Sequence, residues 1–189
     1  MQACKSGGGE DDGKIRITTT TSILRDVVQN LVGENAEVIS LMGAGVDPHL
    51  YKASHGDIER LSSARVIVYN GLHLEGKMTE VFEKMKRKHT LIAFSDGLEK
   101  DQVLAIDKEA GVYDPHLWFS IPKWTECVKH ASKALGQEIP ELKDSIEVNT
   151  KRYLQELNKL HDWILQQVQT IPEGNRILIT SHDAFQYYG

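Results

Sequence analysis

Residues 65–69, Arg65-Val66-Ile67-Val68-Tyr69, form a short and nearly continuous apolar run, which is typical of a β-strand that is covered on both faces. A helical pattern over residues 55–64 precedes this run. After it, Asn70-Gly71 turns the chain into a second helical pattern over residues 72–88, and the strand-like run TLIAF follows at residues 90–94. Strands that alternate with helices in this way favour a parallel sheet.

The same alternation continues toward the N-terminus. Residues 14–19, KIRITT, are rich in β-branched side chains, and Ser22 stands as a capping residue before a helical pattern that Gly33 ends. Residues 36–41, AEVISL, predict the next strand. The sequence therefore predicts an α/β fold whose first lobe is a doubly wound parallel sheet. Ligands of such sheets bind in the crevice beyond the carboxyl ends of the strands.

A four-residue phrase occurs twice, as Asp47-Pro48-His49-Leu50 and as Asp114-Pro115-His116-Leu117. His49 follows the second predicted strand, whereas His116 follows a polar connection over residues 95–113 that a short apolar run interrupts. A third histidine, His182, stands in the triplet Ser181-His182-Asp183. Imidazole is the commonest side-chain metal ligand, and three ring nitrogens suit a borderline divalent cation such as zinc or manganese. We therefore predict that His49, His116 and His182 bind one metal ion.

Apolar residues recur at spacings of three, four or seven from Glu141 to about Thr170, without an internal proline or glycine. This pattern predicts a helix of about thirty residues, which is a rod of about 45 Å. Because a lobe of ~130 residues has a radius of gyration of about 14 Å, the helix should run along the lobe and project beyond it. Pro172 and Gly174 end the pattern, and residues 176–180, RILIT, predict a further strand.

These boundaries divide the chain into four parts. We expect residues 1–13 to be a flexible tether like that of a lipoprotein, and residues 14–139 to be a metal-binding α/β lobe. Residues 140–172 are expected to form a long linking helix, and residues 173–189 the start of a second, incomplete α/β lobe. The predicted strand in that last part would have an open edge, since it lacks neighbouring strands.

Composition and charge restrict the class of protein. The chain has 189 residues, of which 40% are hydrophobic and 26% charged, and these values are ordinary for a globular protein with a sizeable core. Its net charge is −5 and its basic residues form no dense cluster, so nucleic acid is not expected as a partner. No apolar stretch approaches the ~18 residues that a membrane-spanning helix needs.

The two cysteines differ in their surroundings. Cys127 lies in a helical pattern and is expected to pack as a small apolar group. Cys4 follows Ala3 and precedes a glycine-rich, acidic run, which resembles the site at which bacterial lipoproteins are processed and lipidated, although the apolar part of such a signal is missing. We therefore predict lipidation of Cys4 and attachment to the membrane outside the cytoplasm. The alternative is a disordered terminus that contains a thiol.

Five motifs follow one another along residues 15–189: TTTSILRDVV, MGAGVDPHLYKAS, VIVYNGLHLEGKM, DPHLWF and RILITSHDAFQYYG. Together they resemble the cluster of metal-binding solute-binding proteins that serve bacterial manganese and zinc ABC importers, and most closely its TroA-like branch. The resemblance implies two α/β lobes that are joined by one long, rather rigid helix, with the metal ion between the lobes. It implies ligands at His49, His116 and His182.

The sequence also departs from the family pattern at positions that affect which metal is bound and how. The fourth ligand of the family is an aspartate in the later part of the second lobe, which this sequence does not reach, and Asp183 does not take its place. Some manganese-binding relatives have glutamate at the third position, so that His182 resembles sites that accept zinc as well as manganese. The histidine-rich loop of many dedicated zinc-uptake members is absent.

The implied function is the capture of Mn²⁺ or Zn²⁺ outside the cytoplasm and its delivery to the permease of an ABC importer, without catalysis. The protein would be anchored to the membrane through lipid or be periplasmic. A zinc-dependent hydrolase is one alternative, because a zinc site with an open position activates water, but no HExxH motif is present. An adhesin-type surface lipoprotein is another alternative, and no motif supports it specifically.

Glu75 is a candidate for a carboxylate that orients a metal-binding histidine without touching the metal. The alternative interpretation is a solvated carboxylate at the start of a helix. Five further histidines are expected on the surface or on helix faces: His55, His73, His89, His130 and His161.

Overall fold

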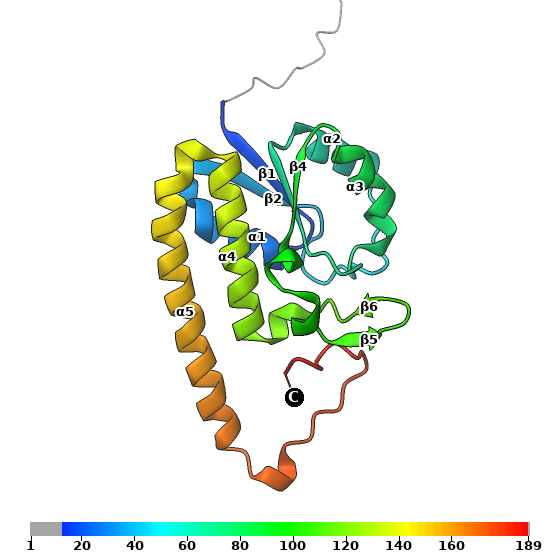
Figure 1. Cartoon of the computed structure of the whole chain (residues 1–189), viewed down its shortest axis with the longest axis vertical. Helices are drawn as coiled ribbons and strands as arrows, with labels where there is room; N and C mark the ends of the chain where they lie inside the picture. The colour runs from blue at the N-terminus through cyan, green and yellow to red at the C-terminus, as the bar shows by residue number, and fades with distance from the viewer. Residues whose placement is uncertain (1–12, 189) are drawn as a thin grey trace, which may run out of the picture.

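The computed structural model describes residues 13–188, so that Cys4 and nearly all of the predicted tether lie outside the described residues. Four parallel strands form one sheet in the order β2–β1–β3–β4. The strands are β1 (Ile15–Thr19), β2 (Ala36–Ser40), β3 (Val66–Tyr69) and β4 (Thr90–Ala93). They are connected in turn by α1 (Ser22–Val32), α2 (His55–Ser63) and α3 (Thr79–Met85). The predicted α/β lobe with a parallel sheet is therefore confirmed (Figure 1).

Strand β3 is covered on both faces, as its continuous apolar run predicts. Val66 and Val68 pack into a core with apolar residues of α1 and of two later helices, α4 (Ile121–Glu138) and α5 (Lys143–Gln169). Ile67 packs on the opposite face against residues of α2 and α3. All three side chains are fully buried. Because successive side chains of a strand point to opposite faces, this arrangement requires helices on both sides of the sheet, which is the doubly wound architecture.

The longest helix is α5, which has 27 residues. Figure 1 shows that it runs beside α4 and continues past it. A hydrogen-bonded pair, Ser132 Oγ and Thr150 Oγ1 at 2.7 Å, joins the two helices, and Asn149 donates to the Leu31 carbonyl at the end of α1. Leu157 is the last buried residue of α5, and Trp163 is 57% exposed. Among the described residues, no helix is both long enough and apolar enough to cross a membrane.

Two predicted elements differ from those in the structure. Residues 176–180 do not form a strand: they are exposed, with Ile179 90% accessible to solvent, and no described strand pairs with them. β-branched residues favour a strand, but a strand forms only where another chain segment satisfies its backbone groups. The helix expected from residue 72 begins only at Thr79, because Leu72 and His73 adopt left-handed backbone angles, with φ of 51° and 62°.

Two local features were not predicted. Residues 95–113 contain a small antiparallel hairpin of β5 (Ala105–Asp107) and β6 (Val112–Tyr113), which the short apolar run within this polar connection did not reveal. Helix α1 is capped by Thr21 rather than by Ser22, since the Thr21 side chain accepts a hydrogen bond from the Leu24 amide. The hairpin matters for the site because it directly precedes the second DPHL phrase.

We predict that Gly97→Ala destabilises the lobe. A Cβ atom at this position would lie 2.7 Å from Cys127 Cα and 2.8 Å from the Glu126 carbonyl, both in the backbone of α4. Overpacking of this kind costs about 1–3 kcal/mol of unfolding free energy, which urea denaturation followed by circular dichroism will measure. The control is Gly174→Ala, where the new methyl group meets no atom within 4 Å and the change should stay within about 0.5 kcal/mol. Equal effects of the two substitutions would contradict the prediction.

Candidate metal centre

The first DPHL phrase lies in the loop between β2 and α2, where a turn at Asp47 presents His49. The backbone N–H of His49 donates to Asp47 Oδ1 at 2.9 Å, which closes an Asx turn. Two residues further on, the Tyr51 hydroxyl donates to Asp57 Oδ2 at 2.7 Å. Asp57 is in α2, so this hydrogen bond anchors the loop of His49 to the start of a helix.

Asp57 is 2% exposed and forms a reciprocal cap with Ser54 at the N-terminus of α2. Its Oδ2 accepts from the Ser54 amide and hydroxyl, while Arg60 donates to its Oδ1. Burial alone would raise the pKa of Asp57, but the hydrogen bonds from Ser54 and Tyr51 outweigh burial and hold the pKa below its usual range. The carboxylate therefore remains ionised at neutral pH and continues to accept the hydrogen bond from the Tyr51 hydroxyl.

The second DPHL phrase repeats this turn in a buried setting. The backbone N–H of His116 donates to Asp114 Oδ1 at 2.9 Å, and His116 Nδ1 lies 2.6 Å from the same oxygen. Asp114 is fully buried and His116 is 5% exposed. Because a carboxylate accepts, Nδ1 is assigned as the N–H of the ring, which leaves the lone pair of Nε2 free. A carboxylate behind a histidine in this way is a common support for metal ligands.

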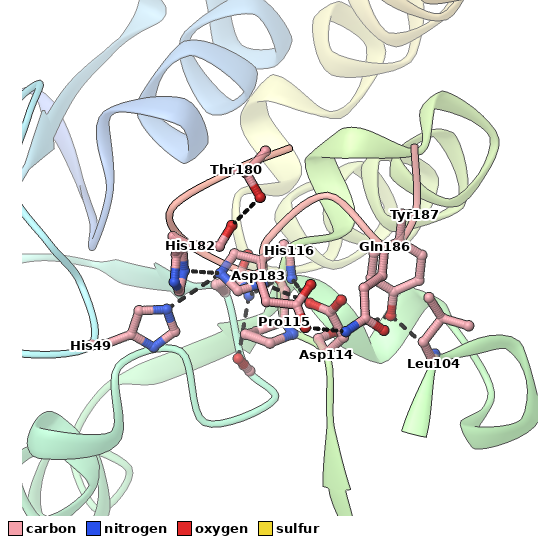
Figure 2. Close-up of polar contacts among 12 residues, drawn as sticks. His49, Leu104, Asp114, Pro115, His116, Thr180, His182, Asp183, Gln186 and Tyr187 are labelled. Carbon is pink, nitrogen blue, oxygen red and sulfur yellow. Dashed lines mark hydrogen bonds and ion pairs between the residues drawn. The ribbon is translucent and has the colours of Figure 1, made fainter. Parts of the chain in front are cut away.

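The three predicted histidines converge, as Figure 2 shows. Their candidate ligand atoms all lie within 4.8 Å of one another. His116 Nε2 lies 3.3 Å from His49 Nε2 and 3.2 Å from His182 Nε2. Zinc–nitrogen bonds of ~2.0–2.1 Å in tetrahedral geometry separate ligand nitrogens by about 3.3–3.4 Å. We call His49, His116 and His182 the three-histidine cluster.

Electrostatics at the cluster favour the neutral form of the His49 ring. Burial lowers the pKa of His49 below its ordinary value, and the neighbouring imidazole of His116 lowers it further. A neutral imidazole is the form that binds a metal ion. The second carboxylate oxygen of Asp114, Oδ2, is buried without a hydrogen-bond partner among the described residues. Such an oxygen favours a nearby positive charge, so the donor set fits a divalent cation.

Glu75 is 3% exposed, so it is not the solvated carboxylate at a helix start that was one of its two interpretations. Its buried carboxylate accepts hydrogen bonds from Thr20 Oγ1 at 2.6 Å and from the Asn70 amide at 2.8 Å. Within the described part of the chain, its hydrogen bonds reach no histidine of the cluster. Asn70 in turn donates through Nδ2 to the Pro115 carbonyl at 3.0 Å. Glu75 therefore braces the carboxyl ends of β1 and β3, and its link to His116 runs through Asn70 and Pro115.

Sequence reasoning missed Asp114 as the residue that orients His116. The available signal was the Asp-Pro-His spacing, because an aspartate two residues before another residue readily closes a turn onto its amide. The phrase itself did not show that its second copy is buried and its first copy is not, since both copies have the same four residues. Asp183, the other nearby carboxylate, accepts a hydrogen bond from Gln186 at 2.8 Å.

Comparisons with known proteins show the family to which the chain belongs. The model of the ZnuA family, described as zinc-uptake complex component A periplasmic, matches residues 17–189. The manganese-binding lipoprotein MntA of Bacillus subtilis is 41% identical over 184 residues, which cover 97% of this chain and 60% of MntA. The metal ABC transporter substrate-binding lipoprotein FimA of Streptococcus parasanguinis is 31% identical over 197 residues, which cover the whole of this chain and 63% of FimA.

A solved structure shows the same fold. The periplasmic zinc-binding protein TroA of Treponema pallidum superposes with a TM-score of 0.89 at 38% sequence identity, over 93% of this chain and 63% of TroA. The chain thus spans about three fifths of the length of the curated relatives that it matches. The family match covers far more than half of the sequence and confirms the resemblance that the motifs indicated. This chain belongs to the ZnuA family of zinc-uptake complex component A periplasmic proteins.

Proposed function

We propose that this chain is the metal-capturing part of an extracytoplasmic solute-binding protein, which binds Mn²⁺ or Zn²⁺ and delivers it to an ABC-type importer. His49, His116 and His182 are the proposed ligands. The observation that carries the proposal is the meeting of ring nitrogens from three separate segments. The Nε2 atoms of His49 and His182 lie 3.3 and 3.2 Å from Nε2 of His116, and a buried carboxylate supports the His116 ring. The metal is the cargo of this protein rather than a resident cofactor.

The relatives support a transition metal as cargo. Their names describe manganese binding in MntA, zinc binding in TroA and metal ABC transport in FimA. Nitrogen sites generally hold zinc more tightly than manganese, so a choice between the two must come from geometry, availability or the complex that the permease accepts. Three imidazoles in the cluster favour zinc or manganese over hard cations such as calcium, which prefer oxygen ligands.

We propose a carrier and not an enzyme. The hydrolase alternative needs a general base beside an open metal position. Asp114, the carboxylate that bonds to a histidine of the cluster, is fully buried and its Oδ1 accepts both the backbone N–H and the ring Nδ1–H of His116, so it is poorly placed to take a proton from water. No feature of the cluster favours the adhesin alternative. A screen for hydrolysis with and without a chelator tests this, since a carrier releases no product in either condition.

The proposed partners follow from the relatives that are named as lipoproteins of ABC transporters. We propose that the permease of an importer receives the metal, and that lipidated Cys4 holds the protein at the outer side of the membrane. We also propose that residues 14–139 act as the metal-binding lobe, that residues 140–172 link it to a second lobe, and that residues 173–189 begin that lobe. Radiolabelled fatty acid incorporation into the wild type and a Cys4→Ala variant, expressed behind a signal sequence, tests the anchor.

Removal of one proposed ligand should abolish tight binding. We expect His49→Ala and His116→Ala each to weaken Zn²⁺ affinity by at least about 100-fold, because even residues that only support a ligand contribute 10- to 100-fold. Isothermal titration of metal-free protein measures this. The control is His55→Ala, since His55 is exposed and pairs with Glu59 outside the cluster. Undiminished binding by both cluster variants would sink the proposal.

The carboxylate behind His116 should contribute separately. We expect Asp114→Asn to weaken Zn²⁺ binding by about 10- to 100-fold, because a neutral amide no longer holds the Nδ1 proton as strongly. The matched control is Asp47→Asn, which changes the equivalent residue of the first phrase, whose oxygen accepts only the backbone N–H of His49. Titration of both variants beside the wild type separates ring support from turn formation. Equal losses in the two variants would contradict a special role for Asp114.

Metal affinity should fall with decreasing pH. Protons compete for the ring nitrogens, so that binding weakens as the pH decreases through about 6.5, the ordinary pKa of histidine. Since the pKa of His49 is lowered, protonation of this ring sets in at a more acidic pH than that of an ordinary histidine. Zn²⁺ titrations at pH 7.5, 6.5 and 5.5 measure the dependence. Constant affinity over this range would argue against imidazole ligands.

A further inference from the structure

The position of His182 is not explained by the segment that carries it. Every residue from Thr170 to Asp183 is exposed, and this stretch returns from the end of α5 without a helix longer than one turn or a strand. His182 itself is exposed, and its ring contacts are with His49 and His116. A segment with so few buried contacts has low local stability unless neighbouring residues fix it to the rest of the fold. Residues close to His182 in the sequence must therefore attach this segment to the first lobe.

The attachment lies in the residues that follow. Ala184 is 6% exposed, and the Phe185 ring packs on Phe119 with their centroids 4.2 Å apart. Tyr187 packs against the core of the first lobe. In Figure 1 the last segment of the chain, drawn in red, accordingly passes beside the β5–β6 hairpin. These contacts begin two residues after His182, so they restrict where its imidazole can lie.

The Tyr187 hydroxyl makes the polar contacts of this attachment. It accepts the Leu104 N–H at 3.1 Å and donates to the Asp114 carbonyl at 2.9 Å. The Asp114 amide also donates to the Leu104 carbonyl at 2.8 Å, so both partners lie at the base of the β5–β6 hairpin. Burial raises the pKa of Tyr187 to about 12, which keeps the hydroxyl protonated and able to donate. Figure 2 shows Tyr187 beside Asp114 and Leu104.

We infer that Tyr187 is a positioning residue for the metal site, which anchors the segment of His182 to the residue that supports His116. One hydroxyl thereby ties the exposed third histidine to Asp114, whose carboxylate holds the central one. The inference rests on the proposed function, because it assigns Tyr187 a role in completing the same site. Tyr187 does not bind the metal itself.

The test compares two adjacent tyrosines in the 189-residue chain. Tyr187→Phe removes only the hydroxyl and should weaken Zn²⁺ affinity by about 5- to 30-fold, as expected when one group that serves two backbone partners is lost. Tyr188→Phe is the control, since Tyr188 is 48% exposed and no described group bonds to its hydroxyl, and its affinity should equal that of the wild type. Equal affinities of the wild type and Tyr187→Phe overturn the inference.

A double-mutant cycle distinguishes positioning of His182 from general destabilisation. If Tyr187 acts through His182, Tyr187→Phe should cause no further loss in a His182→Ala background. A loss of the same size in that background overturns the inference. In Co²⁺-loaded protein, the visible absorption bands should change in Tyr187→Phe toward those of His182→Ala, and unchanged bands would speak against a shared role.

Hydrogen exchange supplies a readout that does not depend on metal. In metal-free protein, the amides of residues 181–188 should exchange faster in Tyr187→Phe than in the wild type or Tyr188→Phe, and equal exchange in all three overturns the anchor. Failure of the wild type to bind Zn²⁺ in a His49- and His116-dependent manner would instead overturn the proposed function. Faster exchange in Tyr187→Phe would then still support the anchor itself, so that the two failures are distinguishable.

Discussion

The buried carboxylate of Asp114 is the contact on which the three-histidine cluster depends. One of its oxygens accepts both the backbone N–H and the ring Nδ1 of His116, so it sets the turn of the loop and the direction of the ring at once. The backbone of the same residue pairs with Leu104 and accepts the Tyr187 hydroxyl. A charge in this fully buried position is costly unless its partners remain in place. The loop, the central ring and the returning end of the chain are therefore coupled through one residue.

The parallel sheet makes such a meeting of segments possible. All four strands point their carboxyl ends toward one edge, and the loops that follow them share that edge. There Glu75 bonds to Thr20 after β1 and to Asn70 after β3, and Asn70 bonds to Pro115 in the second DPHL phrase. On the other side, Tyr51 and Asp57 anchor the loop that follows β2. The loops of His49 and His116 are thus each tied by hydrogen bonds to other elements of the first lobe.

The histidines also differ in how firmly the fold holds them. His116 is buried and braced by a carboxylate, His49 is partly buried on an anchored loop, and His182 is exposed on a segment that gains buried contacts only after it. The two more buried histidines lie in the first lobe, and the third lies on a segment that is attached through a few side chains.

The sequence by itself determined the elements whose signal is local. The apolar run of β3, the helical repeat of α5 and the two DPHL phrases were readable because strand burial, helix periodicity and Asx turns depend on residues close in the chain. Only the tertiary structure decided that RILIT stays unpaired, that α3 begins after a left-handed turn at Leu72 and His73, and that the Asp114 carboxylate bonds to the His116 ring. The physical reason is that strand pairing, burial of a charge and the anchoring of His182 by Tyr187 depend on contacts between residues that are far apart in the sequence.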